Sequence, residues 1–172
     1  MSNQPVAERL IARLVTILSQ EMRMYNELLL VLRKKQSSII EGKLEGLKEA
    51  VMQEQAILKQ SESVAEDREA SIKEISDALG KDEQIRTLTQ LIGVVETTYA
   101  ERLSNIHRSL QQIVQEVMLT NEENRYLLDY SIKFVREAAR ELVKSSEQFP
   151  VYSAEGRGDE GPSGSSLIEG RI

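Results

Sequence analysis

The sequence contains no cysteine and no tryptophan, and only 3 of its 172 residues are proline. Without cysteine, disulfide bonds and thiolate chemistry are excluded. Aromatic residues make up 4% of the chain, and glycine is scarce before the C-terminus. Leucine, isoleucine, valine, alanine, glutamate, glutamine, lysine and arginine dominate instead, which is the composition of long helices. We therefore expect an all-α chain with one main domain.

Few residues are present that could form a catalytic site. An acid–base or nucleophilic site needs a nucleophile, a base and usually a third group that orients the base. The chain has one histidine, His107. A di-iron bundle needs a glutamate three residues before a histidine on each of two helices, and here Ser104 occupies that position before His107. Phosphate-binding glycine motifs are also absent, and carboxylate pairs such as Glu45 with Glu49 are typical of a solvated helix face. We expect neither an enzyme nor a cofactor or metal site.

The charge balance excludes one further class of partner. The chain has 22 basic and 28 acidic residues, a net charge of −6, and no basic cluster reaches the density of a phosphate-binding surface, so nucleic acid is not an expected partner. No run of about 18 uninterrupted apolar residues is present, and the N-terminus lacks a secretory signal pattern. These features predict a cytoplasmic protein with no stable membrane insertion.

Apolar residues recur at helical spacing in the first half of the chain. A first helix is expected from Pro5, which suits a first turn, to Gln36, with turn signals between Ile40 and Lys43. A second helix is expected over Leu44–Leu79, with Gly80 as its C-terminal cap. Because the link between them is short, the two helices should lie antiparallel.

A short helix and a third long helix are expected after Gly80. The short helix covers residues 82–92, with Gly93 as a joint. The long helix begins near Val94 or Val95 and ends at about Ser145 or Ser146. Apolar residues in it alternate in steps of three and four, which is the pattern of a coiled-coil seam, at Leu103, Ile106, Leu110, Ile113 and Val117.

The same seam turns polar at Thr120, Asn121 and Asn124. A polar residue at a seam position fixes the register between helices at some cost in stability, and asparagine is the best-attested choice. Tyr126 and Tyr130 flank the change from polar to apolar residues, and packing at the edge of the core is the simpler account of both.

The stretch Asn121–Val143 carries more apolar surface than one helix of a bundle needs. With successive residues about 100° apart around the axis, the side we call the first arc contains Leu128, Ile132, Val135, Ala139, Leu142 and Val143. Beside it, the second arc contains Leu127, Tyr130, Phe134 and Ala138. The arcs together cover roughly 220°, whereas a surface helix needs about 100°. Either two helices of the same chain enclose the stretch, or one arc is exposed for a partner, and the pattern leaves both open.

The composition changes after Phe149 and Pro150, which end the helix. Residues 153–170 hold five glycines, four serines and one proline, and so few apolar side chains do not offset the entropy lost on ordering. We therefore expect a helical domain over residues 1–149 and a flexible tail over residues 150–172.

Tyr152 stands at the start of this tail. It has no core to enter, so a pocket on a partner is its natural binding site. The end of the tail, Ile168–Arg171, matches a protease-cleavage tag, and is either native or an added sequence.

Several stretches together carry a resemblance to a known family. They are Glu21–Leu29, Gly42–Leu47, Glu54–Leu58, the pattern Asn121-x-x-Asn124-x-x-Leu127-Leu128 leading to Phe134, and Val151–Gly156. Through them most of the chain resembles the FlgN family of flagellar type III export chaperones. Ser153 departs from the pattern, because the family often has glycine after the tail tyrosine.

The resemblance implies an all-α chaperone, with an elongated, coiled-coil-like bundle of long antiparallel helices and a disordered C-terminal tail. Such a chaperone binds the C-terminal helical segments of hook-filament junction (hook-associated) proteins, keeps them unpolymerised and presents them to the export gate. By this resemblance Tyr152 would engage the cytoplasmic domain of the gate component FlhA. The client surface would consist of Asn121, Asn124, Leu127, Leu128, Ile132, Phe134 and Val135.

The residues alone predict a related class of protein. A monomer with surplus apolar area on one helix should bind an amphipathic helix in a groove. The alternative is a structural coiled-coil or adaptor protein that homodimerises through the same helix. Peripheral membrane binding would need a basic polar face, and the mixed charges opposite the two arcs argue against it.

Overall fold

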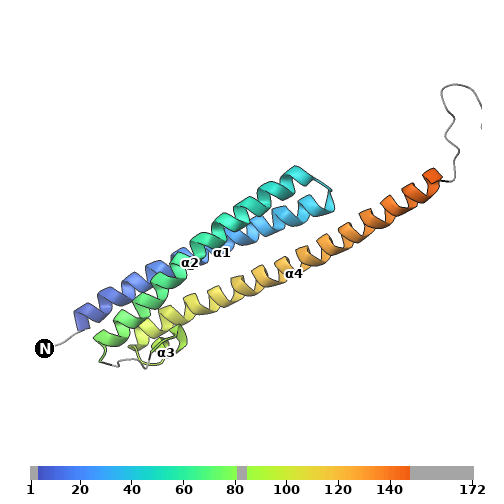
Figure 1. Cartoon of the computed structure of the whole chain (residues 1–172). Helices are drawn as coiled ribbons and strands as arrows, with labels where there is room; N and C mark the ends of the chain where they lie inside the picture. The colour runs from blue at the N-terminus through green and yellow to red at the C-terminus, as the bar shows by residue number, and fades with distance from the viewer. Residues whose placement is uncertain (1–3, 81–84, 148–172) are drawn as a thin grey trace, which may run out of the picture. The chain divides into compact units, whose positions relative to one another are not determined.

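The computed structural model describes residues 4–80 and 85–147, and these residues form helices and connecting turns without any strand (Figure 1). The helices are α1 (Gln4–Ile40), α2 (Leu44–Ala78), α3 (Leu88–Ile92) and α4 (Thr97–Glu147). The prediction of an all-α fold with long helices is therefore confirmed. The expected tail, with Phe149, Pro150 and Tyr152, lies outside the described residues.

A tight turn joins α1 to α2, where the sequence predicts it. Gly42 has a φ of +67°, a left-handed conformation that glycine adopts without strain. The amide of Lys43 donates a hydrogen bond to the carbonyl oxygen of Ser38 over 2.9 Å. A Cβ atom on Gly46 would lie 2.7 Å from Oγ of Ser38, so glycine at this position lets the two antiparallel helices approach closely.

The short helix α3 is smaller than the sequence predicts. It covers five residues and begins at Leu88, whereas the prediction covers residues 82–92, of which residues 82–84 are outside the described part. The start is fixed by a capping box, in which Thr87 Oγ1 accepts from the amide of Gln90 and the side chain of Gln90 accepts from the amide of Thr87. This reciprocal pair satisfies amides at the start of the helix and holds Thr87 itself in an extended conformation.

The long helix α4 begins at Thr97, slightly later than the expected start at Val94 or Val95. The reason is local, because the amides of Val94 and Val95 both donate to the carbonyl oxygen of Leu91 and so belong to the turn that closes α3. From Thr97 the helix continues for 51 residues.

Two hydrophobic clusters form the core of the bundle. At the α3 end, Leu14 and Leu18 of α1 pack with Ile72 and Ile75 of α2, together with residues of α3 and α4. Near the α1–α2 turn the second cluster is smaller, and it contains Leu28, Val31, Leu32, Ala50 and Ile57 with Val117 packed against it. The predicted seam of α4 is used, since Leu103, Leu110 and Ile113 are buried and Ile106 and Val117 are half-buried.

The chain divides into two compact units, the first over Met1–Ser131 and the second from Ile132 onward. The first unit contains α1, α2, α3 and most of α4. The described part of the second is the last segment of α4, Ile132–Glu147. The boundary expected between residues 149 and 150 lies outside the described residues and stays a prediction.

Candidate binding surface on the last helix

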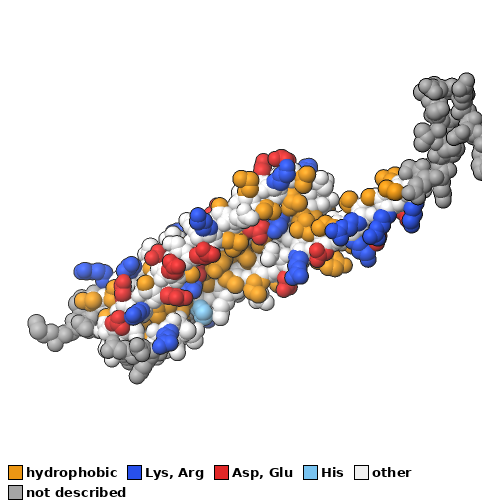
Figure 2. Space-filling view, in the orientation of Figure 1, with side chains coloured by type: hydrophobic (Ala, Val, Ile, Leu, Met, Phe, Trp, Pro, Cys, Tyr) orange, Lys and Arg blue, Asp and Glu red, His pale blue; other side chains and the backbone are white. Residues whose placement is uncertain are grey.

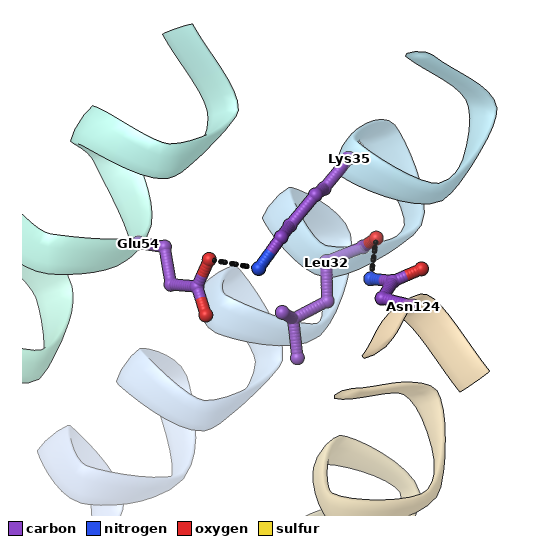
Figure 3. A network of polar contacts seen from close by, with 4 residues as sticks. All are labelled: Leu32, Lys35, Glu54 and Asn124. Carbon is purple, nitrogen blue, oxygen red and sulfur yellow. Dashed lines mark hydrogen bonds and ion pairs between the residues drawn. The ribbon is translucent and has the colours of Figure 1, made fainter. Parts of the chain in front are cut away.

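Asn124 connects α4 to α1 in the first unit. Its side chain is fully buried, and Nδ2 donates a hydrogen bond to the carbonyl oxygen of Leu32 over 2.8 Å (Figure 3). Among the described residues, Oδ1 has no hydrogen-bond partner. One specific bond from a buried amide fixes the register of two helices, because sliding would leave the donor unpaired. In this structure Asn124 therefore contacts its own chain and not the surface.

Two exposed polar contacts also connect α1 to α4. Arg33 forms an ion pair with Glu116 over 3.4 Å, and Nε2 of Gln36 donates to Oε2 of Glu123 over 3.0 Å. Such exposed contacts contribute little to stability. Their value is geometric, since they show that α1 lies along α4 as far as residue 123.

Apolar residues of α4 become more exposed after Asn124. Leu127 and Leu128 are half-buried. Tyr126 and Tyr130 are 73% and 63% exposed. The prediction that both tyrosines pack at the edge of the core is therefore wrong. A shallow hollow of about 460 Å³ lies beside Tyr126 and Leu127 and is otherwise lined by Gln36, Glu122 and Glu123. Asn121 is exposed as well.

The described part of the second unit exposes both apolar arcs. Every residue from 132 to 145 is exposed, and the large apolar side chains keep between 47% and 71% of their surface in contact with solvent, namely Ile132, Phe134, Val135, Leu142 and Val143. The sequence left two interpretations open, namely enclosure by two helices of the same chain or exposure of one arc for a partner. Within the part of the chain that the structure describes, residues 132–145 are not enclosed. Exposed apolar side chains in contiguous stretches are typical of interaction sites, so this segment is the candidate binding surface.

Charged residues of both signs accompany these apolar side chains. Lys133, Arg136 and Arg140 lie in the same segment as Glu137, and Lys144 forms an exposed ion pair with Glu141 over 3.2 Å. Figure 2 shows basic and hydrophobic side chains together on the last part of α4. An amphipathic partner helix would find apolar surface here with charges of both signs at its margins.

The single histidine lies near α3, away from the last segment of α4. Nε2 of His107 lies 3.5 Å from Oγ1 of Thr89, and no group of three or more metal-binding side chains occurs within residues 4–80 and 85–147. No helix in the described ranges is long and apolar enough to cross a membrane.

A second exposed apolar surface lies on α2, and the sequence does not predict it. We call it the α2 stripe, and it consists of Leu44, Leu47, Val51 and Leu58. Leu44 and Leu58 are exposed, and Leu47 and Val51 are half-buried. Periodicity shows that such residues share a helix face, but it does not show whether a neighbouring helix covers that face.

Comparison with known proteins gives one result. A family model described as FlgN protein matches residues 1–160. No curated protein and no solved structure matches the chain.

Proposed function

This chain belongs to the FlgN family, and we propose that it is the cytoplasmic chaperone of hook-filament junction proteins. The family is one of flagellar export chaperones and not of enzymes, so the general role of the chain is to assist the export of flagellar proteins. The identity of its clients, its contact with the export gate and its place in the cytoplasm belong to our proposal.

The observation that carries the proposal is the exposure of both apolar arcs over residues 132–145. A helical segment of a client that polymerises through its own apolar face would bury that face against α4 in the helix-in-groove mode. The mechanism is competition, since the client helix cannot pair with its own kind while it lies on the chaperone. The chaperone itself needs no nucleotide for this.

The residues of the proposed client surface have two different roles. Leu127, Leu128, Ile132, Phe134 and Val135 supply apolar contacts, and exposed Asn121 contacts the margin of the client. Asn124 acts as a positioning residue, because its bond to Leu32 fixes α4 on α1. Phe134, on the second arc and 63% exposed, is the centre of the proposed contact.

Tyr152 has a separate role in the proposal. Its position after Phe149 and Pro150, at the end of the helical sequence, and the resemblance of Val151–Gly156 to the family's tail pattern support an aromatic anchor for the gate component FlhA. Client binding and gate binding would then use different parts of the chain, so the chaperone can hold its client while it docks.

A homodimeric coiled coil is the second candidate, because a second copy of α4 would also cover the two arcs. Light scattering of the purified chain across a range of concentrations distinguishes the two. We expect a constant monomer mass that increases by one client on addition of a purified hook-filament junction protein from the same bacterium.

The control for this measurement is a matched exposed residue. Phe134→Asp should abolish the increase in mass, whereas Leu30→Asp on α1, where leucine is 66% exposed, should leave it unchanged. A stable dimer of the chain alone that Phe134→Asp dissociates would contradict the chaperone proposal and favour the coiled coil.

A further inference from the structure

The two apolar arcs of α4 are too wide for one partner helix. A helix packs on its neighbour through an apolar stripe of about 100°, whereas the two arcs together cover roughly 220°. Ile132 of the first arc and Phe134 of the second lie on nearly opposite sides of the helix, about 160° apart, and they are 47% and 63% exposed. A single helix that covers Phe134 therefore leaves Ile132 in contact with solvent.

The charged side chains of this segment are separated by sign around the helix. Within residues 132–145 the basic residues fall in one sector of roughly 80° beside the first arc, and they are Lys133, Arg136, Arg140 and Lys144. The acidic residues Glu137 and Glu141 follow that sector and adjoin the second arc. These six are all the charged residues of the segment. Figure 2 shows the basic side chains gathered along one side of the last part of α4.

Most of these basic residues have no acidic partner. We call Lys133, Arg136 and Arg140 the basic margin, and each of them is exposed. None of the three forms an ion pair with a residue in the described ranges, whereas Lys144 pairs with Glu141 over 3.2 Å. Charged residues beside an apolar seam set the choice of partner through ion pairs between helices. The first arc is therefore suited to a helix with an acidic edge.

A second copy of α4 does not supply such an edge. In an antiparallel two-fold pair the same margins of the two helices face each other, so Arg136 and Arg140 would meet their own copies and repel them. In a parallel two-fold pair the basic margin would face the second arc, which is apolar. Neither arrangement places a carboxylate beside the basic margin.

Two other occupants match only part of this surface. Residues 150–172 include Glu155, Asp159 and Glu160 but few large apolar side chains, so they match the charge of the basic margin and not the apolar arc beside it. An anionic membrane would need a polar face that is basic throughout, and Glu137 and Glu141 interrupt that face.

We propose that the last part of α4 takes two helices of one client, one on each arc, and that the helix on the first arc carries acidic residues along the edge that faces the basic margin. Both arcs lie on the same stretch of about 20 Å, so two helices joined by a loop can reach them. Arg136 and Arg140 are one turn apart and match carboxylates spaced three or four residues apart on the client. The inference rests on the proposed function and adds a second client segment with its own chemistry.

Photocrosslinking at one level of α4 tests this arrangement. In separate variants, Ile132 or Phe134 is replaced by p-benzoylphenylalanine, whose photoreactive group has a short reach. The same replacement at Leu30, which is 66% exposed on α1, is the matched control. Each variant is mixed with an excess of a purified hook-filament junction protein from the same bacterium and irradiated. Mass spectrometry then identifies the attached peptides.

We expect positions 132 and 134 to attach to two different peptides of the client, each with a yield several-fold above that of position 30. The peptide at position 132 should carry aspartate or glutamate residues three or four apart. Adding Arg136→Glu with Arg140→Glu should lower the yield at position 132 several-fold and leave the yield at position 134 unchanged. Arg136→Lys with Arg140→Lys keeps the charge and should leave both yields unchanged.

The same client peptide at both positions, or attachment at only one of them, would overturn this inference and leave the proposed function intact. Attachment of position 132 to a second copy of the chain or to residues 150–172 would overturn it as well. An unchanged yield at position 132 after the charge reversal would also contradict it. Control yield at both positions would remove the proposed function too.

Discussion

Truncation of Phe134 separates client binding from folding. The side chain is 63% exposed, so Phe134→Ala removes little buried surface and should change the free energy of unfolding by less than about 0.5 kcal/mol. Alanine is also the better helix former, so the helix content should not fall.

The loss of client affinity can be estimated from the same exposure. Full burial of a phenylalanine side chain contributes about 1.5–3 kcal/mol. If the client covers the 63% that is exposed, the lost contribution is about 1–2 kcal/mol. At about 1.4 kcal/mol for each factor of ten, Phe134→Ala should raise the Kd for the client by roughly 5- to 30-fold.

Isothermal calorimetry with a purified hook-filament junction protein measures this change, and thermal unfolding of the free variant checks its stability. Leu30→Ala is the control, because Leu30 is 66% exposed on α1, outside the proposed client surface. An unchanged Kd for Phe134→Ala, or an equal loss for Leu30→Ala, would refute the assignment of the client surface.

Substitutions at three further positions test other parts of the account. Asn124→Asp should lower the free energy of unfolding by about 3 kcal/mol or more, because it replaces a buried donor with a charge facing the carbonyl of Leu32. Asn124→Leu should change the free energy of unfolding little. Urea unfolding of the two variants measures the difference. Burial, followed by the nearby Glu21 carboxylate, raises the pKa of Tyr25, so its contribution to stability is complete below about pH 10 and is lost as the pH rises through the folded pKa. Urea unfolding at increasing pH should therefore show a steeper alkaline loss for the native chain than for Tyr25→Phe. Tyr152→Ala should leave client affinity in calorimetry unchanged and reduce export of the client in cells; weaker client affinity would contradict the separate roles of helix and tail.

Much of the fold follows from local patterns in the sequence. Helical spacing of apolar residues and Gly42 predict α1, the turn and α2, because these features depend on residues close together in the chain. The seam of α4 is predicted for the same reason. The start of α3 at Leu88 was missed, although the Thr87 and Gln90 capping box is present in the sequence and gives the signal.

The candidate site is less predictable, because exposure depends on which elements meet. The sequence shows two apolar arcs near Phe134 but leaves open whether its own helices cover them, and the structure exposes both over residues 132–145. For Asn124 the polar seam position is predicted, but its partner Leu32 lies 92 residues earlier in the chain. The α2 stripe is partly exposed, and a helix pattern alone does not show whether a neighbouring helix covers a face.

Hydrogen–deuterium exchange of residues 132–145 tests the central claim most directly. In the free chain these residues expose their apolar side chains to solvent, and a helical segment with few buried apolar contacts opens readily. We expect fast amide exchange in the free chain and strong protection when a purified hook-filament junction protein is present in excess. Slow exchange in the free chain, or no added protection with the client bound, would contradict the account.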